Sequence, residues 1–160
     1  MCSHRLGILQ CTRRGMHWRA WVLCGLICLV NLFPPEVLII VLSIGAHPDD
    51  ETCAGGTLIK YAEEGHDVYI LVTTRGEGGS TGEPPVCERS ELGRVREQEG
   101  RHAGAVIGAR QVIYLPYVDP DATDGITKAV DATPEEFSAS IQEVLEHLHP
   151  DVIITHGTDG

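Results

Sequence analysis

The feature that most constrains the fold is an aliphatic run, VLIIVLSIGA at residues 37–46, which leads directly into charged side chains. The run has the length of a β-strand, is rich in β-branched residues and shows no alternation of apolar and polar positions. A strand of this kind is buried on both faces, as in a parallel sheet that helices cover on either side. The run therefore predicts a buried strand of an α/β domain.

Helical and strand patterns alternate after this run. One helix has a clear start at Thr133-Pro134-Glu135-Glu136, where Thr is an N-cap, Pro lies in the first turn and the last Glu completes a capping box. The order β-α-β-α-β-α-β predicts a Rossmann-like three-layer α/β/α fold with a mostly parallel sheet. The further strands are expected at 67–74, 111–115 and 151–155, and the helices at 57–64, about 88–107 and 133–148.

Residues 1–36 differ from the rest of the chain and are predicted to lie outside the domain, which spans 37–160. They hold four arginines against one glutamate, and residues 20–33 form an apolar run. A membrane span needs about 20 such residues, and no small-residue cleavage site follows, as a secretory signal would have. Three interpretations stay open: a short membrane anchor, an atypical signal, or upstream sequence included through a wrong start codon. Pro34-Pro35 marks the boundary.

The composition of the chain limits the kinds of partner that can be expected. With a net charge of −11, the chain lacks the excess of basic residues that binding to a phosphate backbone requires, so a nucleic acid partner is not expected. Only two of the six cysteines lie in the domain and no C-x-x-C pair is present, which predicts free thiols in a reducing, cytoplasmic compartment. Membrane association is expected only through residues 20–33. The sequence does not indicate an oligomeric state.

A cluster of polar side chains follows the first strand: His47, Asp49, Asp50 and Glu51. In open parallel sheets, ligands bind beyond the carboxyl ends of the strands. Imidazole and carboxylate suit zinc and similar divalent ions. Two adjacent carboxylates can take different roles: one binds the metal, and the other accepts a proton from water. The cluster therefore predicts a divalent-metal hydrolase site. The alternative interpretation is that Asp49 or Asp50 only caps the next helix.

The stretch AHPDDETCAGGTL (46–58) resembles the signature of the LmbE-like (PIG-L-type) N-acetylglucosaminyl deacetylase family. Other elements of that family are matched in the same order by LVTTRGEGG (71–79), by an R-x-x-E-x-x-x-A helix that begins at Arg96, and by PDVIITH (150–156). The resemblance covers residues 37–160. It implies a deacetylase that uses Zn²⁺ or another divalent cation to hydrolyse the N-acetyl group of a small N-acetylglucosamine-like sugar conjugate, whose aglycone stays open.

The resemblance also implies a role for individual residues. His47 and Asp50 correspond to zinc ligands, Asp49 to the general base, and Arg96 and Asp119 to contacts with the substrate sugar. The family's third zinc ligand is the first His of a Gly-His-Pro-Asp-His motif, which would lie beyond Gly160. The expectation is therefore the N-terminal part of a deacetylase domain, truncated at its C-terminus.

Two other functions stay open on the sequence. The chain could be an inactive truncated remnant of the fold, or a module that binds a sugar or nucleotide without turnover. A dinucleotide is disfavoured because no G-x-G-x-x-G element follows the first strand.

Overall fold

The computed structural model describes residues 37–120 and 130–157. From Leu38 onward these residues belong to one compact unit. The apolar run at 20–33 lies outside the described residues, so the predictions made for it remain predictions. Within the described ranges, no helix combines the length and the apolar character needed to cross a membrane.

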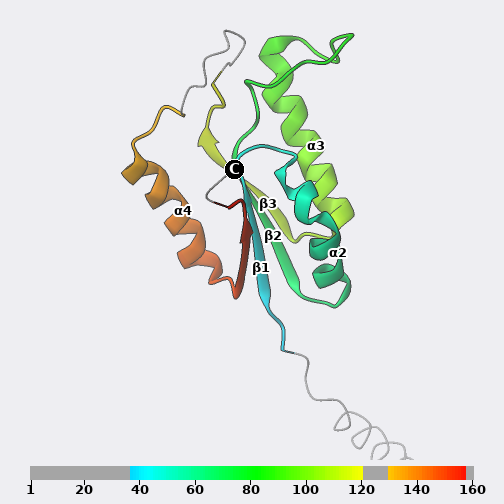
Figure 1. Cartoon of the computed structure of the whole chain (residues 1–160), viewed down its shortest axis with the longest axis vertical. Coiled ribbons are helices and arrows are strands. Elements are labelled where there is room, and N and C mark those ends of the chain that lie inside the picture. Colours follow the sequence, from blue (N-terminus) through cyan, green and yellow to red (C-terminus); the bar gives the residue numbers. More distant parts are fainter. Residues whose placement is uncertain (1–36, 121–129, 158–160) are drawn as a thin grey trace, which may run out of the picture. The chain divides into compact units, whose positions relative to one another are not determined.

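Four parallel strands form a sheet in the order β3-β2-β1-β4 (Figure 1). Helices alternate with the strands along the chain, as the sequence pattern predicts. The structure therefore confirms the Rossmann-like α/β/α fold with a mostly parallel sheet. The strands are β1 (Ile40–Gly45), β2 (Asp67–Thr74), β3 (Gln111–Tyr117) and β4 (Val152–Thr155), and the helices are η1 (Asp50–Ala54), α2 (Gly55–Glu63), η2 (Arg89–Glu91), α3 (Leu92–Ile107) and α4 (Pro134–Leu148).

Helices cover both faces of the sheet, with α2 and α3 on one side and α4 on the other (Figure 1). Successive side chains of a strand point to opposite faces. Accordingly, Val41 packs in the cluster on the α2 and α3 side, whereas its neighbour Leu42 packs in the cluster that α4 covers. Both side chains are fully buried, which confirms that the first strand is buried on two faces. The α4 residues packed against the sheet are Ile141, Val144, Leu145 and Leu148.

Several boundaries differ from the predicted ones. The first helix begins before Thr57, because η1 leads straight into α2. The helix predicted from residue 88 starts with the short η2 turn and becomes α-helical at Leu92. Strand β3 continues through Pro116 to Tyr117 rather than ending at Leu115. An edge strand tolerates proline because its free side needs no N–H donor, and β3 lies at the edge of this sheet.

Candidate active site

The carboxylate of Asp50 shapes the turn at the carboxyl end of β1. Its Oδ2 accepts hydrogen bonds from the backbone N–H groups of Ala46 (2.6 Å) and His47 (2.9 Å). Gly45 leaves room for this arrangement, because a Cβ there would lie 2.7 Å from the Asp50 Cβ. One carboxylate oxygen is thus used to fold the turn. The other, Oδ1, lies 3.4 Å from Nε2 of His156 at the end of β4.

Two threonines at the end of β2 hold the same turn from the neighbouring strand. The Ala46 carbonyl accepts from the hydroxyls of Thr73 (3.1 Å) and Thr74 (3.0 Å) and from the Thr74 N–H (3.0 Å). Both threonines are buried. Sequence reasoning did not identify them, although two hydroxyl residues that close an otherwise apolar strand were the available signal.

Arg96 reaches from α3 to the exposed carboxylate of Asp49. Its Nη2 lies 3.1 Å from Asp49 Oδ2 and 3.3 Å from the Pro48 carbonyl, while Nη1 donates to the Gly76 carbonyl at 3.3 Å. Gly76 has a φ of +70°, and a Cβ there would lie 2.2 Å from Arg96 Nη1. The guanidinium therefore ties α3 to both the β1 turn and the loop after β2. The Asp49 side chain keeps 64% of its surface exposed, against 19% for Arg96.

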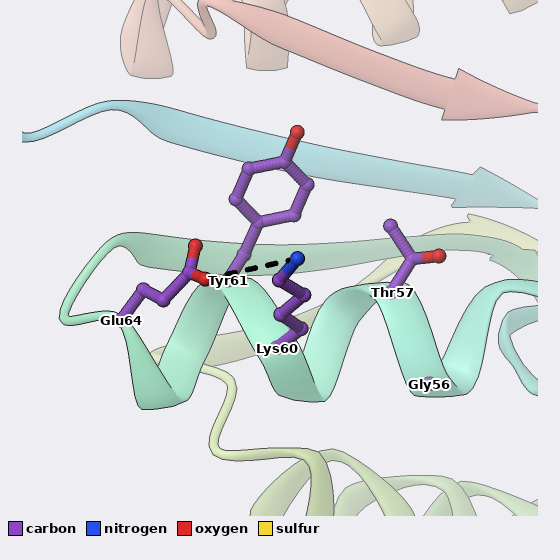
Figure 2. A pocket seen from close by; sticks show the side chains of 5 residues that line it. All are labelled: Gly56, Thr57, Lys60, Tyr61 and Glu64. Atoms are coloured by element: carbon purple, nitrogen blue, oxygen red, sulfur yellow. Dashed lines mark ion pairs between the residues drawn. The ribbon is translucent and has the colours of Figure 1, made fainter.

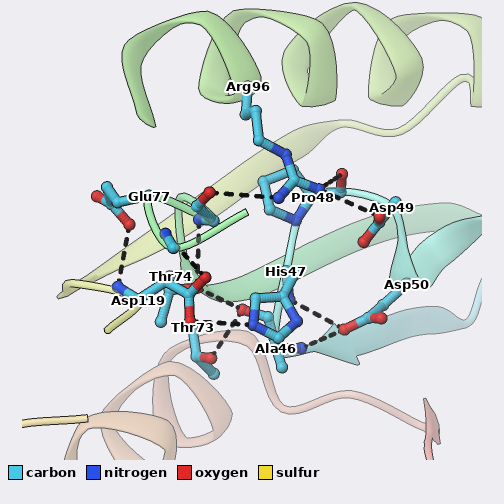
Figure 3. A network of polar contacts seen from close by, with 12 residues as sticks. Ala46, His47, Pro48, Asp49, Asp50, Thr73, Thr74, Glu77, Arg96 and Asp119 are labelled. Atoms are coloured by element: carbon cyan, nitrogen blue, oxygen red, sulfur yellow. Dashed lines mark hydrogen bonds and ion pairs between the residues drawn. The ribbon is translucent and has the colours of Figure 1, made fainter. Parts of the chain in front are cut away.

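On the other side of the turn, His47 contacts Asp119 in the loop after β3 (Figure 3). The distance from His47 Nε2 to Asp119 Oδ1 is 3.3 Å. Asp119 Oδ2 accepts the Gly78 N–H (3.1 Å), and Glu77 Oε2 accepts the Asp119 N–H (3.0 Å). Burial alone would raise the pKa of Glu77, but the N–H donors and the Arg75 guanidinium at 2.8 Å hold it below its ordinary value.

Glu51 is the motif side chain that does not face solvent. It is only 6% exposed. Burial raises its pKa above the ordinary value, and the charges of Asp49 and Asp50 add to this, against the opposing effect of a backbone hydrogen bond. Solvent therefore reaches Asp49 rather than Glu51.

The donors available for a divalent cation come from the β1 turn and the end of β4. The structure places the two predicted ligands, His47 and Asp50, in one turn and brings His156 to Asp50. These are imidazole and carboxylate groups of the kind that zinc prefers. In the described part of the chain, however, no three His, Cys, Asp or Glu side chains are arranged so that they could hold a metal ion together. The donors fit such a cation in chemistry but form an incomplete set.

A small hollow of about 60 Å³ lies beside Asp50 and His156. It opens between β1, η1 and β4, and the exposed thiol of Cys53 forms part of its wall. A larger hollow of about 330 Å³ runs along α2, lined by Gly56, Thr57, Lys60, Tyr61 and Glu64, and contains none of the predicted site residues (Figure 2). The smaller hollow, in contrast, is lined by the motif carboxylate Asp50 and by His156.

The fold and the polar turn define an α/β protein with its site at the carboxyl edge of a parallel sheet. Residues 42–160 match the family model described as GlcNAc-PI de-N-acetylase, or PIG-L. The chain belongs to this family. A probable N-acetyl-α-D-glucosaminyl L-malate deacetylase from Bacillus anthracis is 31% identical over 118 residues, which cover 72% of this chain and 49% of the relative.

Solved structures share the fold at lower identity. The N,N'-diacetylchitobiose deacetylase from Pyrococcus horikoshii superposes with a TM-score of 0.59 at 23% identity, covering 88% of this chain and 50% of that one. A 4-carboxy-2-hydroxymuconate hydratase from Pseudomonas putida reaches 0.58 at 20% identity, covering 74% and 47%. The chain thus spans about half the length of these proteins. Since a hydratase has the same fold, the reaction must be argued from the site.

Proposed function

We propose that the protein is a metal-dependent deacetylase that removes the acetyl group from an N-acetylglucosamine-like sugar conjugate. The observation that carries the proposal is the AHPDDE turn at the carboxyl end of β1, which holds His47 and Asp50 together, with Asp50 lining the small hollow and Asp49 open to solvent. Family membership supports it. The family description and the Bacillus anthracis relative name different aglycones but the same acetylated sugar, so this sugar is the proposed point of recognition.

His47 and Asp50 are the proposed ligands of Zn²⁺ or another divalent cation. When bound, the cation supplies a Lewis acid that polarises the acetyl carbonyl and lowers the pKa of water. The carboxylate of Asp49 takes the proton from the attacking water, and Arg96 on its Oδ2 limits its rotation. Water adds to the carbonyl carbon, and the C–N bond breaks as its nitrogen takes up the proton removed from the water, so that acetate and a free amino sugar leave. His156 is a candidate additional ligand, because it lies 3.4 Å from Asp50 Oδ1.

The predicted sugar contacts of Arg96 and Asp119 remain predictions. Both side chains lie on the same edge of the sheet as the β1 turn, where a sugar could reach them. Each already has a protein partner, Asp49 for Arg96 and His47 for Asp119. A carboxylate oxygen has two lone pairs and can accept a sugar hydroxyl besides an imidazole N–H. The cytoplasmic location and the separate nature of residues 1–36 likewise remain predictions.

The test is acetate release by the complete gene product from N-acetylglucosaminyl conjugates of malate and of inositol. We expect turnover that a chelator abolishes and added zinc restores. Asp49→Asn should lower kcat by at least about 100-fold, the scale of a lost general base, while Asp131→Asn, an exposed control, should change nothing. Turnover that survives both the chelator and Asp49→Asn would disprove the mechanism. Tight sugar binding without turnover would favour a binding module, and neither activity would favour an inactive remnant.

A further inference from the structure

The loops after β2 and β3 are joined by two carboxylates that bind each other's backbone. Glu77 Oε2 accepts the N–H of Asp119 at 3.0 Å, and Asp119 Oδ2 accepts the N–H of Gly78 at 3.1 Å. We call this pair of contacts the Glu77–Asp119 clamp. Each segment thus both donates to the other and accepts from it, which fixes the position of one loop relative to the other more firmly than a single bond would.

The clamp leaves one carboxylate oxygen for a different partner. Glu77 Oε1 is taken by the Arg75 guanidinium at 2.8 Å, and Glu77 Oε2 and Asp119 Oδ2 are taken by the clamp itself. The remaining oxygen, Asp119 Oδ1, lies 3.3 Å from His47 Nε2. Figure 3 shows the His47 ring between Asp119 on one side and Asp50 on the other. Because an ionised carboxylate can only accept, His47 Nε2 must carry the hydrogen in this contact.

The surroundings hold the clamp in place. The Glu77 stem packs against Gly93 of α3, where a Cβ would lie 2.7 Å from Glu77 Cγ. Gly78 approaches the loop after β3 so closely that a Cβ there would lie 2.2 Å from the Pro120 carbonyl oxygen. The side chains of Glu77 and Asp119 are only 20% and 17% exposed. Both carboxylates are therefore closely packed and largely shielded from solvent.

We infer that Glu77 is a positioning residue: through the Glu77–Asp119 clamp it sets the Asp119 carboxylate that orients His47 and fixes its Nε2–H tautomer. The inference rests on the proposed function in one respect, that His47 is a metal ligand. An imidazole whose Nε2–H is held by a carboxylate has an unprotonated Nδ1, whose lone pair can bind a metal ion. A carboxylate that holds a ligand histidine in this way raises the basicity of the imidazole and fixes the orientation of its ring. Asp119 thereby gains a role toward His47 besides its predicted contact with the sugar.

The first experiment measures the His47 ring in the whole 160-residue chain without metal. Long-range ¹⁵N–¹H spectra distinguish a ring N–H from an unprotonated nitrogen, and His47→Gln assigns the signals. We expect the Nε2–H tautomer in the wild type and a shift toward a mixture in Glu77→Gln, because the single amide oxygen of glutamine cannot accept from both the Arg75 guanidinium and the Asp119 N–H. Glu91→Gln, which changes the same charge on an exposed surface, should leave the ring signals unchanged.

The second experiment measures zinc affinity by competition with a chromophoric chelator. Glu77→Gln and Asp119→Asn should each weaken binding by about 10- to 100-fold, the usual effect of losing an outer partner of a metal ligand. Because both act through one clamp, the double variant should be little weaker than the worse single variant. Far-UV circular dichroism checks that each variant folds. If Glu77→Gln does not fold, Asp119→Asn gives the same two readouts from the other side of the clamp.

The outcomes separate this inference from the proposed function. Wild-type ring signals and unchanged zinc affinity in folded Glu77→Gln would overturn the clamp, and so would fully additive effects in the double variant. A complete gene product that binds no zinc would contradict the metal-dependent function, while a tautomer shift in Glu77→Gln would still support the clamp. Loss of zinc affinity together with the tautomer shift would support both.

Discussion

Arg96 shows how much of this site depends on one side chain. Its planar guanidinium contacts the Asp49 carboxylate and the carbonyls of Pro48 and Gly76 at the same time. Three acceptors on two loops are satisfied by one fork of donors, which a single ammonium cannot reproduce. The same contacts explain why the loop after β2 carries glycine at 76, where a side chain would collide with the guanidinium.

Replacing Arg96 by Lys should therefore destabilise the domain even though the charge is kept. We expect a loss of about 1–2 kcal/mol in the free energy of unfolding, because part of a hydrogen-bonded network around a half-exposed ion pair disappears. Urea unfolding followed by circular dichroism measures it. Arg94→Lys is the matched control, since Arg94 lies on the same helix with 58% of its side chain exposed. Equal losses in the two variants would contradict the special position of Arg96.

At the scale of elements, α4 is less buried than its apolar pattern suggests. Its apolar stripe packs against the sheet as expected, yet none of its residues is fully buried. Its start is well defined: the Thr133 side chain accepts the Glu136 N–H at 3.2 Å, and Glu136 Oε2 accepts the Thr133 N–H at 2.9 Å. The predicted capping box is thus confirmed. Its hydrogen bonds help to stabilise a helix that has no fully buried residue.

We predict that Thr133→Ala lowers the stability of the domain by about 1 kcal/mol, as expected for the loss of an N-cap side chain. Thr133→Ser keeps the hydroxyl and should remain close to the wild type. Thermal or denaturant unfolding compares the three proteins, and hydrogen exchange shows whether the first turn of α4 opens first. An Ala variant as stable as the Ser variant would mean that packing alone holds α4.

At the scale of the whole molecule, two carboxyl groups, the buried Glu51 and the half-buried Glu77, should respond to pH in opposite ways. The pKa of Glu77 is lowered in the fold, so its ionised form adds stability above its unfolded pKa, near 4.5, and this is lost as pH falls. The pKa of Glu51 is raised, so its ionisation costs stability once pH rises past the same value. The two side chains therefore test, in opposite directions, how a pKa shift changes the dependence of stability on pH.

The measurement is the free energy of unfolding of the wild type, Glu77→Gln and Glu51→Gln between pH 3 and pH 7. The deficit of Glu77→Gln relative to the wild type should grow as pH rises. Glu51→Gln should instead improve relative to the wild type over the same range, because the amide carries no charge to desolvate. Parallel curves for the two variants would show that the pKa shifts of these groups do not contribute to stability.

Local sequence patterns determined the elements and the motif. Continuous aliphatic runs predicted the buried strands, the capping box predicted the start of α4, and AHPDDE placed the polar turn at the end of the first strand. These features depend on neighbours in the chain, because strand and helix periodicity and cap chemistry act over a few residues. The boundaries that differed, at η1, η2 and Pro116, are those where a short 3₁₀ turn or an edge position changed the local preference.

Only the tertiary structure decided the partners of each site residue. Asp49 meets Arg96 across 47 positions of sequence, and His47 meets Asp119 across 72. The parallel order β3-β2-β1-β4 brings these strand ends to one edge, and close packing of the loops then selects which carboxylate oxygen faces which donor. The sequence therefore determined which groups are present at the β1 turn. The hydrogen bonds of Thr73 and Thr74 to Ala46, the contacts of Arg96 and the Glu77–Asp119 clamp follow instead from long-range packing that no local pattern encodes.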